Sequence, residues 1–207
     1  MSEVEGDAFW DEWQRLTRFL ESTQVAYDRE VQSLSSLRGN SLTVRSAGTY
    51  EVPLDEHLAT VKDKDILFAS VLIHSYALAE SAAADQLGIP LRELQGIEEW
   101  GTDLLAAAGA SWEQVEGGLA GAVEVAVARN SLAHATPELD AQSVNRLRRA
   151  GAKGHAIGEL VTLHYGTLQQ YRKRLRVLLH TGGVLRSAAN GRRVPRVLRL
   201  AGAAKNQ

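Results

Sequence analysis

The chain has 207 residues, of which 44% are hydrophobic, and its formal net charge at pH 7 is -2. This length suffices for one well-buried domain, and the absence of cysteine excludes disulfide bonds and zinc sites built on thiolates. Residues 1–12 are acidic and lack the basic segment of an export signal, and no apolar run approaches the roughly 18 residues that span a bilayer. We therefore expect a cytoplasmic protein with no membrane segment.

The small net charge hides an uneven distribution along the chain. Residues 1–35 carry 3 basic and 8 acidic side chains, residues 36–140 carry 6 and 16, and residues 141–207 carry 14 and 1. A C-terminal third with one carboxylate is typical of a protein that approaches a polyanion such as RNA. The alternative is that these cations pair with the acidic part of the same chain or of a second subunit.

The first half of the chain predicts two long helices separated by an irregular insertion. Residues 7–35 place apolar side chains at helical spacing, which predicts a long amphipathic helix. Residues 37–62 lose this period and collect glycine, asparagine and proline, so we expect a loop with one small hairpin. Residues 63–87 are apolar nearly all round and are followed by Gly88 and Pro90, which predicts a central helix that ends there.

The second half predicts further helices and a tail. We expect a helix over residues 91–108, and a second one that starts at a capping box of Ser111 with Gln114 and runs past residue 129. A short helix can follow Pro137, and a last long helix is expected over residues 157–185. The predicted fold is all-α, a bundle of about five helices over residues 1–186, with the insertion at about 37–62 and a basic, poorly ordered tail at 187–207.

The hexapeptide Arg-Asn-Ser-Leu-Ala-His at residues 129–134 combines three groups that suit phosphate chemistry. The arginine can neutralise a phosphate, the imidazole can move protons near neutral pH, and the amide can orient the ring. Residues four apart share one face of a helix, so Asn130 is expected beside His134, whereas Arg129 projects from a neighbouring face. The alternative is a helix end at which the arginine and histidine only cap carbonyl groups.

This hexapeptide and its surroundings resemble the HEPN family of small α-helical domains, which bear an Arg-x4-6-His motif. The polar residue after the arginine, here Asn130, the preceding apolar helix, and an earlier apolar helix with an embedded acid, here Glu80, carry the resemblance. It implies a metal-independent endoribonuclease, without a cofactor, that cleaves RNA at a site shared by two subunits. It further implies Arg129, His134 and Asn130 as the catalytic residues. Independently of the resemblance, Glu80 lies in an apolar helix and can pair with Arg129 as a supporting group; the alternative is a partly exposed helix carboxylate. Such domains act as toxins or in defence against phage, and an antitoxin or nucleotidyltransferase accompanies some of them.

The basic stretch of the last predicted helix is the second candidate for RNA contact. It supplies the side chains Arg172, Lys173, Arg174 and Arg176. Two other functions stay open beside cleavage. The protein can bind RNA or a nucleotide without cutting it, or it can be an interaction module whose apolar central helix pairs with itself or with a partner protein.

The remaining histidines and tryptophans are weaker candidates. The spacing of the motif recurs at Arg148 and Arg149 before His155 and at Arg174 before His180, where we expect solvated or core-edge side chains. His74 and His164 are expected in the core. His57 follows two acids, but adjacent side chains diverge, so no metal site is predicted there. The tryptophans at positions 10, 13, 100 and 112 are expected to anchor the packing.

Overall fold

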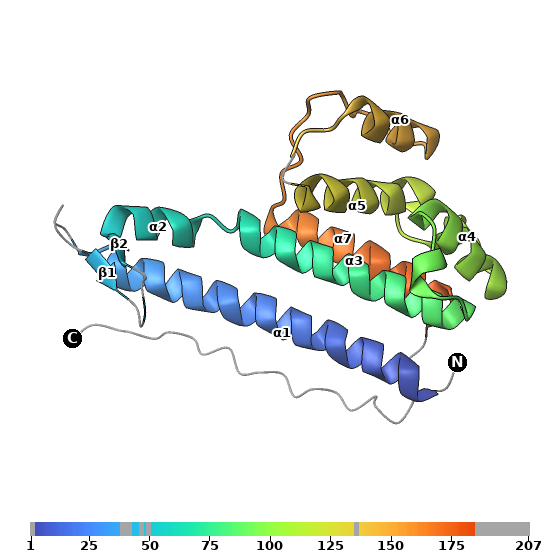
Figure 1. Cartoon of the computed structure of the whole chain (residues 1–207), viewed down its shortest axis with the longest axis horizontal. Coiled ribbons are helices and arrows are strands. Elements are labelled where there is room, and N and C mark those ends of the chain that lie inside the picture. Colours follow the sequence, from blue (N-terminus) through green and yellow to red (C-terminus); the bar gives the residue numbers. More distant parts are fainter. Residues whose placement is uncertain (1–2, 38–42, 46–47, 49–50, 135–136, 185–207) are drawn as a thin grey trace, which may run out of the picture.

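The computed structural model describes residues 3–37, 43–45, 48, 51–134 and 137–184 (Figure 1). The described chain is a helical bundle with one small hairpin, which confirms the predicted all-α fold with a hairpin insertion. The tail predicted at 187–207 lies outside the described residues. Seven α-helices are found among the described residues, where about five were expected.

Helix α3 (Asp65–Leu87) lies at the centre of the bundle and packs against α1, α4, α5 and α7. Its side chains Leu72, Ala79 and Ala83 are fully buried, because apolar residues occupy nearly every face of the helix. Gly88 ends it in a left-handed conformation (φ 68°), as the sequence predicts. By length and composition alone the stretch Leu54–Leu87 could cross a membrane, but half of its most apolar window is buried inside the bundle.

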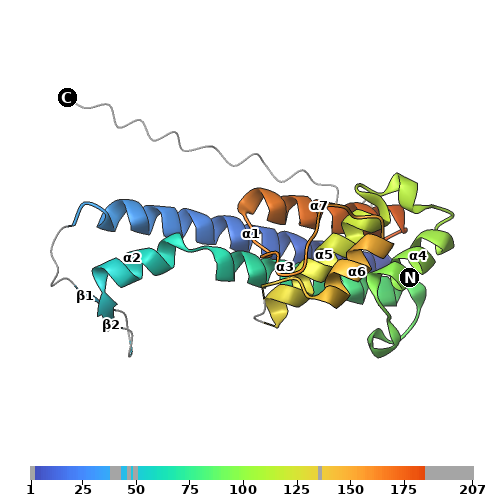
Figure 2. The same ribbon diagram turned by 90° about the horizontal axis from the view of Figure 1, so that it is seen from above.

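Helix α1 (Glu3–Leu34) runs along one side of the bundle and extends beyond it to the hairpin (Figures 1 and 2). Its first half buries Trp10, Trp13 and Leu20 in the core. Its second half holds α2 (Leu54–Lys62), together with the ion pair between Lys64 Nζ and Asp28 Oδ1 at 2.8 Å. The long amphipathic helix expected here is present, and its two ends pack on different elements.

The insertion contains the expected hairpin and one helix that was not expected. Strands β1 (Thr43–Arg45) and β2 (Glu51–Pro53) pair antiparallel, with Val44 opposite Val52. The prediction that the irregular region extends to residue 62 is wrong, because α2 begins directly after Pro53. The sequence pattern that indicates this helix is short. Leu54 and Val61 lie on the same face of the helix and are both buried, and two acidic residues occupy the first turn.

The two helices that follow α3 in the chain begin later than predicted, in each case directly after a glycine. A 3₁₀ turn (η1, Leu91–Glu93) precedes α4 (Ile97–Ala107), which begins after Gly96. The predicted capping box is present, but it closes only a 3₁₀ turn (η2, Trp112–Gln114). Helix α5 (Gly118–Ala133) begins after Gly117, whose φ of 79° interrupts a continuous helix.

The last predicted helix begins later than expected. Helix α6 (Ala141–Arg149) is capped by Asp140, whose carboxylate accepts from the Ser143 N–H at 2.7 Å. Residues 157–164 are not helical: Gly158 has φ 81°, and Glu138 forms an antiparallel bridge with Leu160. Helix α7 (Tyr165–Thr181) follows, so the prediction of a helix from residue 157 is wrong for its first eight residues.

The elements are stacked in the order α1, then α3 with α7, then α5, then α6, so that α6 lies on the side of α5 away from α1 (Figure 1). Three of the four tryptophans are buried in this core, and Trp112 packs at its edge. The expectation that they anchor the packing is confirmed. Helix α5 therefore lies between α3 on one side and α6 on the other.

Because α4 packs closely against the turn at residue 112, replacing two glycines by alanine should affect stability differently. A Cβ on Gly101 would lie 2.6 Å from Trp112 Cη2, whereas a Cβ on Gly166 would have no atom within 4 Å. We expect Gly101→Ala to lower the free energy of unfolding by about 1–3 kcal/mol, because the indole must move. Gly166→Ala should leave it unchanged or raise it by up to about 1 kcal/mol. Urea titrations followed by circular dichroism measure both, and equal effects would contradict the packing described.

Candidate functional site

The hexapeptide occupies the last turns of α5, as the sequence predicts. Ala133 is the last helical residue and His134 is the C-cap, with its backbone N–H bonded to the Asn130 carbonyl at 3.2 Å. The preceding apolar run, from Ala122 to Ala128, is buried apart from half-exposed Glu124, whereas His134 is exposed. The motif therefore begins where the helix leaves the core.

A hollow of about 390 Å³ lies between the end of α5 and helix α6. Asn130 and His134 both line it, which confirms that they share one face of α5. The wall opposite is polar and includes Arg146 together with the carboxylates of Glu138 and Asp140. The hollow thus places an exposed imidazole next to an amide, a cation and two acids, and its volume falls in the range of small-ligand sites.

Arg129 turns away from this hollow toward α3. Its guanidinium carbon lies 5.4 Å from the centre of the Tyr76 ring, and its Nη1 donates to Asn130 Oδ1 at 2.9 Å. The prediction that Asn130 orients the imidazole is not reproduced, since among the described residues the Asn130 side chain bonds to Arg129 and no hydrogen bond joins it to the His134 ring. Arg129 Nε is buried and unpaired, so the guanidinium keeps a free donor.

Glu80 and Tyr76 lie in the electrostatic field of Arg129. Burial raises the pKa of the Glu80 carboxyl, and the positive charge of Arg129 opposes this rise. Burial and the charge of Glu80 raise the pKa of the Tyr76 hydroxyl, so that it stays protonated at neutral pH. The predicted proximity of Glu80 to Arg129 is thus visible as an electrostatic interaction, although no ion pair joins them among the described residues.

Arg146 is a site residue that the sequence analysis missed. Its Nε and Nη2 bind the two carboxylate oxygens of Glu98 at 2.6 and 2.7 Å, which joins α6 to α4. Its positive charge lowers the pKa of Tyr76, whereas the negative charge of the Glu80 carboxylate raises it. The only signal in the sequence was its place among the basic residues of α6, where nothing distinguished it from Arg148 and Arg149.

The four basic side chains predicted to contact RNA face different surroundings. Arg172 is 3% exposed, and its Nη2 donates to the Trp13 carbonyl and to Thr17 Oγ1. Arg174 is half-buried and pairs with Glu124, and Lys173 Nζ lies 2.7 Å from Glu116 Oε2. Of the four, Arg176 is exposed and makes no ion pair with the described residues. They do not form one exposed basic face.

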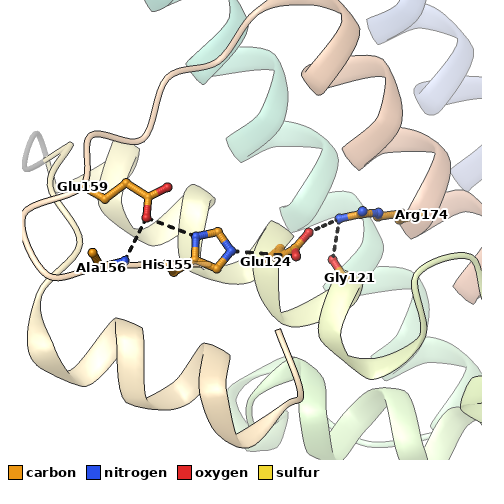
Figure 3. A network of polar contacts seen from close by, with 6 residues as sticks. All are labelled: Gly121, Glu124, His155, Ala156, Glu159 and Arg174. Carbon is orange, nitrogen blue, oxygen red and sulfur yellow. Dashed lines mark hydrogen bonds and ion pairs between the residues drawn. The ribbon is translucent and has the colours of Figure 1, made fainter. Parts of the chain in front are cut away.

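His155 is partly exposed, in line with the expected core-edge position, and it belongs to a network of polar side chains (Figure 3). Its Nδ1 lies 3.4 Å from Glu159 Oε2 and its Nε2 lies 3.9 Å from Glu124 Oε1. Glu124 also accepts from Arg174, whose Nη1 contacts the Gly121 carbonyl as well. The network ties the loop before α7 to the middle of α5, and this tertiary role explains the second motif-like spacing.

Two other histidines differ from their predictions. His74 is exposed on α3 and His164 is exposed at the start of α7, so the prediction that they lie in the core is wrong. Position 74 falls in the one part of the apolar helix that its neighbours leave uncovered. His57 Nε2 lies 3.3 Å from Glu30 Oε1, and no group of three or more metal-ligating side chains occurs in the described part of the chain.

Removing the charge of either of two carboxylates near this site, Glu98 and Glu80, should change the stability of the fold in opposite directions. The Arg146 guanidinium lowers the pKa of Glu98 below 4.5, so the pair stabilises the fold above that pH and loses its effect as pH falls. Glu98→Gln should lower the free energy of unfolding at pH 7 by about 1–2 kcal/mol, since the pair is partly solvated.

Glu80→Gln is the matched comparison, because burial raises the pKa of Glu80 and its charged form is therefore disfavoured in the folded state. This substitution should raise stability at pH 7, and the gain should vanish below about pH 4, where both states are protonated. Urea titrations at pH 7 and pH 3.5 measure both differences. Destabilisation of equal size in the two variants would contradict the assignment of these charges.

Comparison with known proteins does not identify a family for this chain. No family model matches it, and no curated protein or solved structure matches it either. The residues at the end of α5 and their surroundings are therefore the best indication of function.

Proposed function

We propose that this protein is a metal-independent endoribonuclease of the HEPN type, in which Arg129 and His134 act on an RNA phosphodiester. The observation that carries the proposal is the exposed imidazole of His134 at the mouth of a polar hollow, with Asn130 beside it and the guanidinium of Arg129 bonded to that same amide. The Asn130 amide thus connects the Arg129 guanidinium to the face of α5 that carries His134.

The chemistry uses the 2'-hydroxyl that distinguishes RNA from DNA. A neutral His134 takes the proton of the 2'-OH, the oxygen attacks the adjacent phosphorus, and the bond from phosphorus to the 5'-oxygen breaks. Arg129 stabilises the negative charge of the pentacoordinate phosphate. The leaving oxygen takes a proton, and the products are a 2',3'-cyclic phosphate and a 5'-hydroxyl.

A homodimer supplies the second proton carrier. One histidine cannot be base and acid in the same step, and the hollow of one subunit contains His134 as its single histidine. Two copies related by a two-fold axis at the ends of α5 would place two imidazoles and two guanidiniums around one phosphate. The partner subunit's His134 would then protonate the leaving oxygen.

A binding function without cleavage is the second candidate, and one observation favours it. Arg129 packs on Tyr76 and faces α3 rather than the hollow, as a structural side chain would. In that case the protein binds RNA or a nucleotide, or a partner protein, without cleaving RNA.

The cleavage function fits the setting of a cytoplasmic toxin or phage-defence effector that is controlled by an antitoxin or a nucleotidyltransferase.

Incubation with total RNA in the presence of EDTA tests the proposal. We expect the wild-type chain to release fragments with 2',3'-cyclic phosphate ends, and His134→Ala and Arg129→Ala to lower the rate at least about 100-fold, since general acid–base groups contribute on the order of 10²–10⁴. Direct sequencing of the fragment ends and gel densitometry provide the readout.

His74→Ala is the matched control, because His74 is also an exposed histidine at a helix surface, on α3. It should cleave at the wild-type rate. Cleavage that EDTA abolishes, or that survives His134→Ala, would refute the mechanism. RNA binding with strong salt dependence and no new ends would establish the second candidate instead.

A further inference from the structure

A second hollow of about 390 Å³ lies between α1 and α7, and the proposed nuclease does not use it. Its lining includes the cations Arg172, Lys173 and Arg176 and one acid, Glu116. It shares no lining residue with the hollow beside His134. Three cations from two turns of one helix thus converge on a concave surface that carries a single opposing carboxylate.

The charge of Arg172 is unusual because no carboxylate of the described residues bonds to it. Its Nη2 bonds to the Trp13 carbonyl and Thr17 Oγ1, both neutral, and its Nε is buried without a hydrogen-bond partner. The guanidinium also lies over the Trp13 ring, with its carbon 4.8 Å from the ring centre. A buried cation with unused donors is costly unless an anion compensates it.

The neighbouring charges leave this compensation incomplete. Burial lowers the pKa of Arg172 to about 10, and the nearby charge of Arg176 acts in the same direction. The Glu21 carboxylate acts against them, but its Oε1 is already bonded to the Tyr165 hydroxyl at 2.6 Å and to Gln169 Nε2 at 3.5 Å. Glu116 pairs with Lys173 at the rim. The two arginines therefore hold an excess of positive charge.

We propose that the hollow between α1 and α7 binds the phosphate group of a nucleotide-sized ligand, with Arg172 at its base and Arg176 at its rim. Planar guanidinium groups match the oxygens of a phosphate, and the amides of Gln169 and Gln170 provide further donors in the wall. The volume suits one nucleotide rather than a folded RNA. The ligand is either a free nucleotide or the terminal phosphate of an RNA strand.

This inference does not depend on cleavage, so its test can be separated from the test of the nuclease. Isothermal titration of the full chain at low salt uses three probes: adenosine 5'-monophosphate, and a short oligouridine with either a 5'-phosphate or a 5'-hydroxyl. To keep the RNA intact, the oligouridine titrations use the Arg129→Ala/His134→Ala double variant, which should bind the mononucleotide as the wild type does. Preference for the 5'-phosphorylated strand over the mononucleotide identifies an RNA end, and the reverse identifies a free nucleotide.

The variant Arg176→Gln removes an exposed cation of the hollow and should raise the Kd for the mononucleotide at least about 5-fold. Arg29→Gln is the matched control, because it removes the same charge from an exposed position on the far half of α1 and should leave the Kd unchanged. Arg172→Lys, which keeps the charge but loses the planar fork, should also weaken binding, with folding checked by circular dichroism.

Three results would overturn the proposal. The first is that none of the probes binds. The second is that Arg29→Gln weakens binding as much as Arg176→Gln does, which would indicate a diffuse charge effect. The third is that the double variant at Arg129 and His134 loses mononucleotide binding, which would place the phosphate in the other hollow.

Discussion

The burial of α3 on most of its circumference is the constraint on which the rest of the structure depends. A helix that is apolar nearly all round must be covered by other helices, and α1, α4, α5 and α7 all pack against it. Helix α5 is then pressed between α3 and α6, and its buried side chains are small, mostly alanine and valine. The polar residues Arg129, Asn130 and His134 lie where this packing ends.

The segregation of charge along the sequence becomes pairing between helices in the folded chain. Arg146 of α6 binds Glu98 of α4, Arg174 of α7 binds Glu124 of α5, and Lys173 binds Glu116. Part of the basic C-terminal third thus neutralises the acidic middle of the chain, as the intramolecular alternative anticipated. The cations that this pairing leaves over are informative, because charge that the fold does not compensate is available to a ligand.

The sequence predicted features that depend on local pattern and missed those that depend on distant contacts. Helical periodicity predicted α1, α3 and the end of α5. The end of α3 at Gly88 was also predicted, because glycine tolerates the left-handed conformation that ends a helix. Helix α2 was missed because its nine residues give too short a period.

The same limit explains the errors in the candidate sites. Arg172 and Arg176 have the same charge and lie four residues apart on α7, yet one is buried against Trp13 of α1 and the other is exposed. Spacing cannot separate them, because the difference is set by a residue 159 positions away. The contacts of His155 likewise do not follow from its spacing to Arg148 and Arg149, because Glu124 on another helix contributes to its environment. Residue type and local period predict which groups can do chemistry, and only tertiary contacts decide which of them are free to do it.

The position of the motif at a helix C-terminus bears on how many subunits a nuclease site would need. The last carbonyl groups of α5 form the negative end of a helix dipole, and the carboxylates of Glu138 and Asp140 line the same hollow. A phosphate placed there meets repulsion that Arg146, already neutralised by Glu98, does little to offset. Arg129 of the same subunit faces α3, so one chain provides too little positive charge at His134. The electrostatics of the hollow therefore disfavour phosphate binding by one chain alone, which is why the proposed nuclease site needs positive charge from outside this hollow.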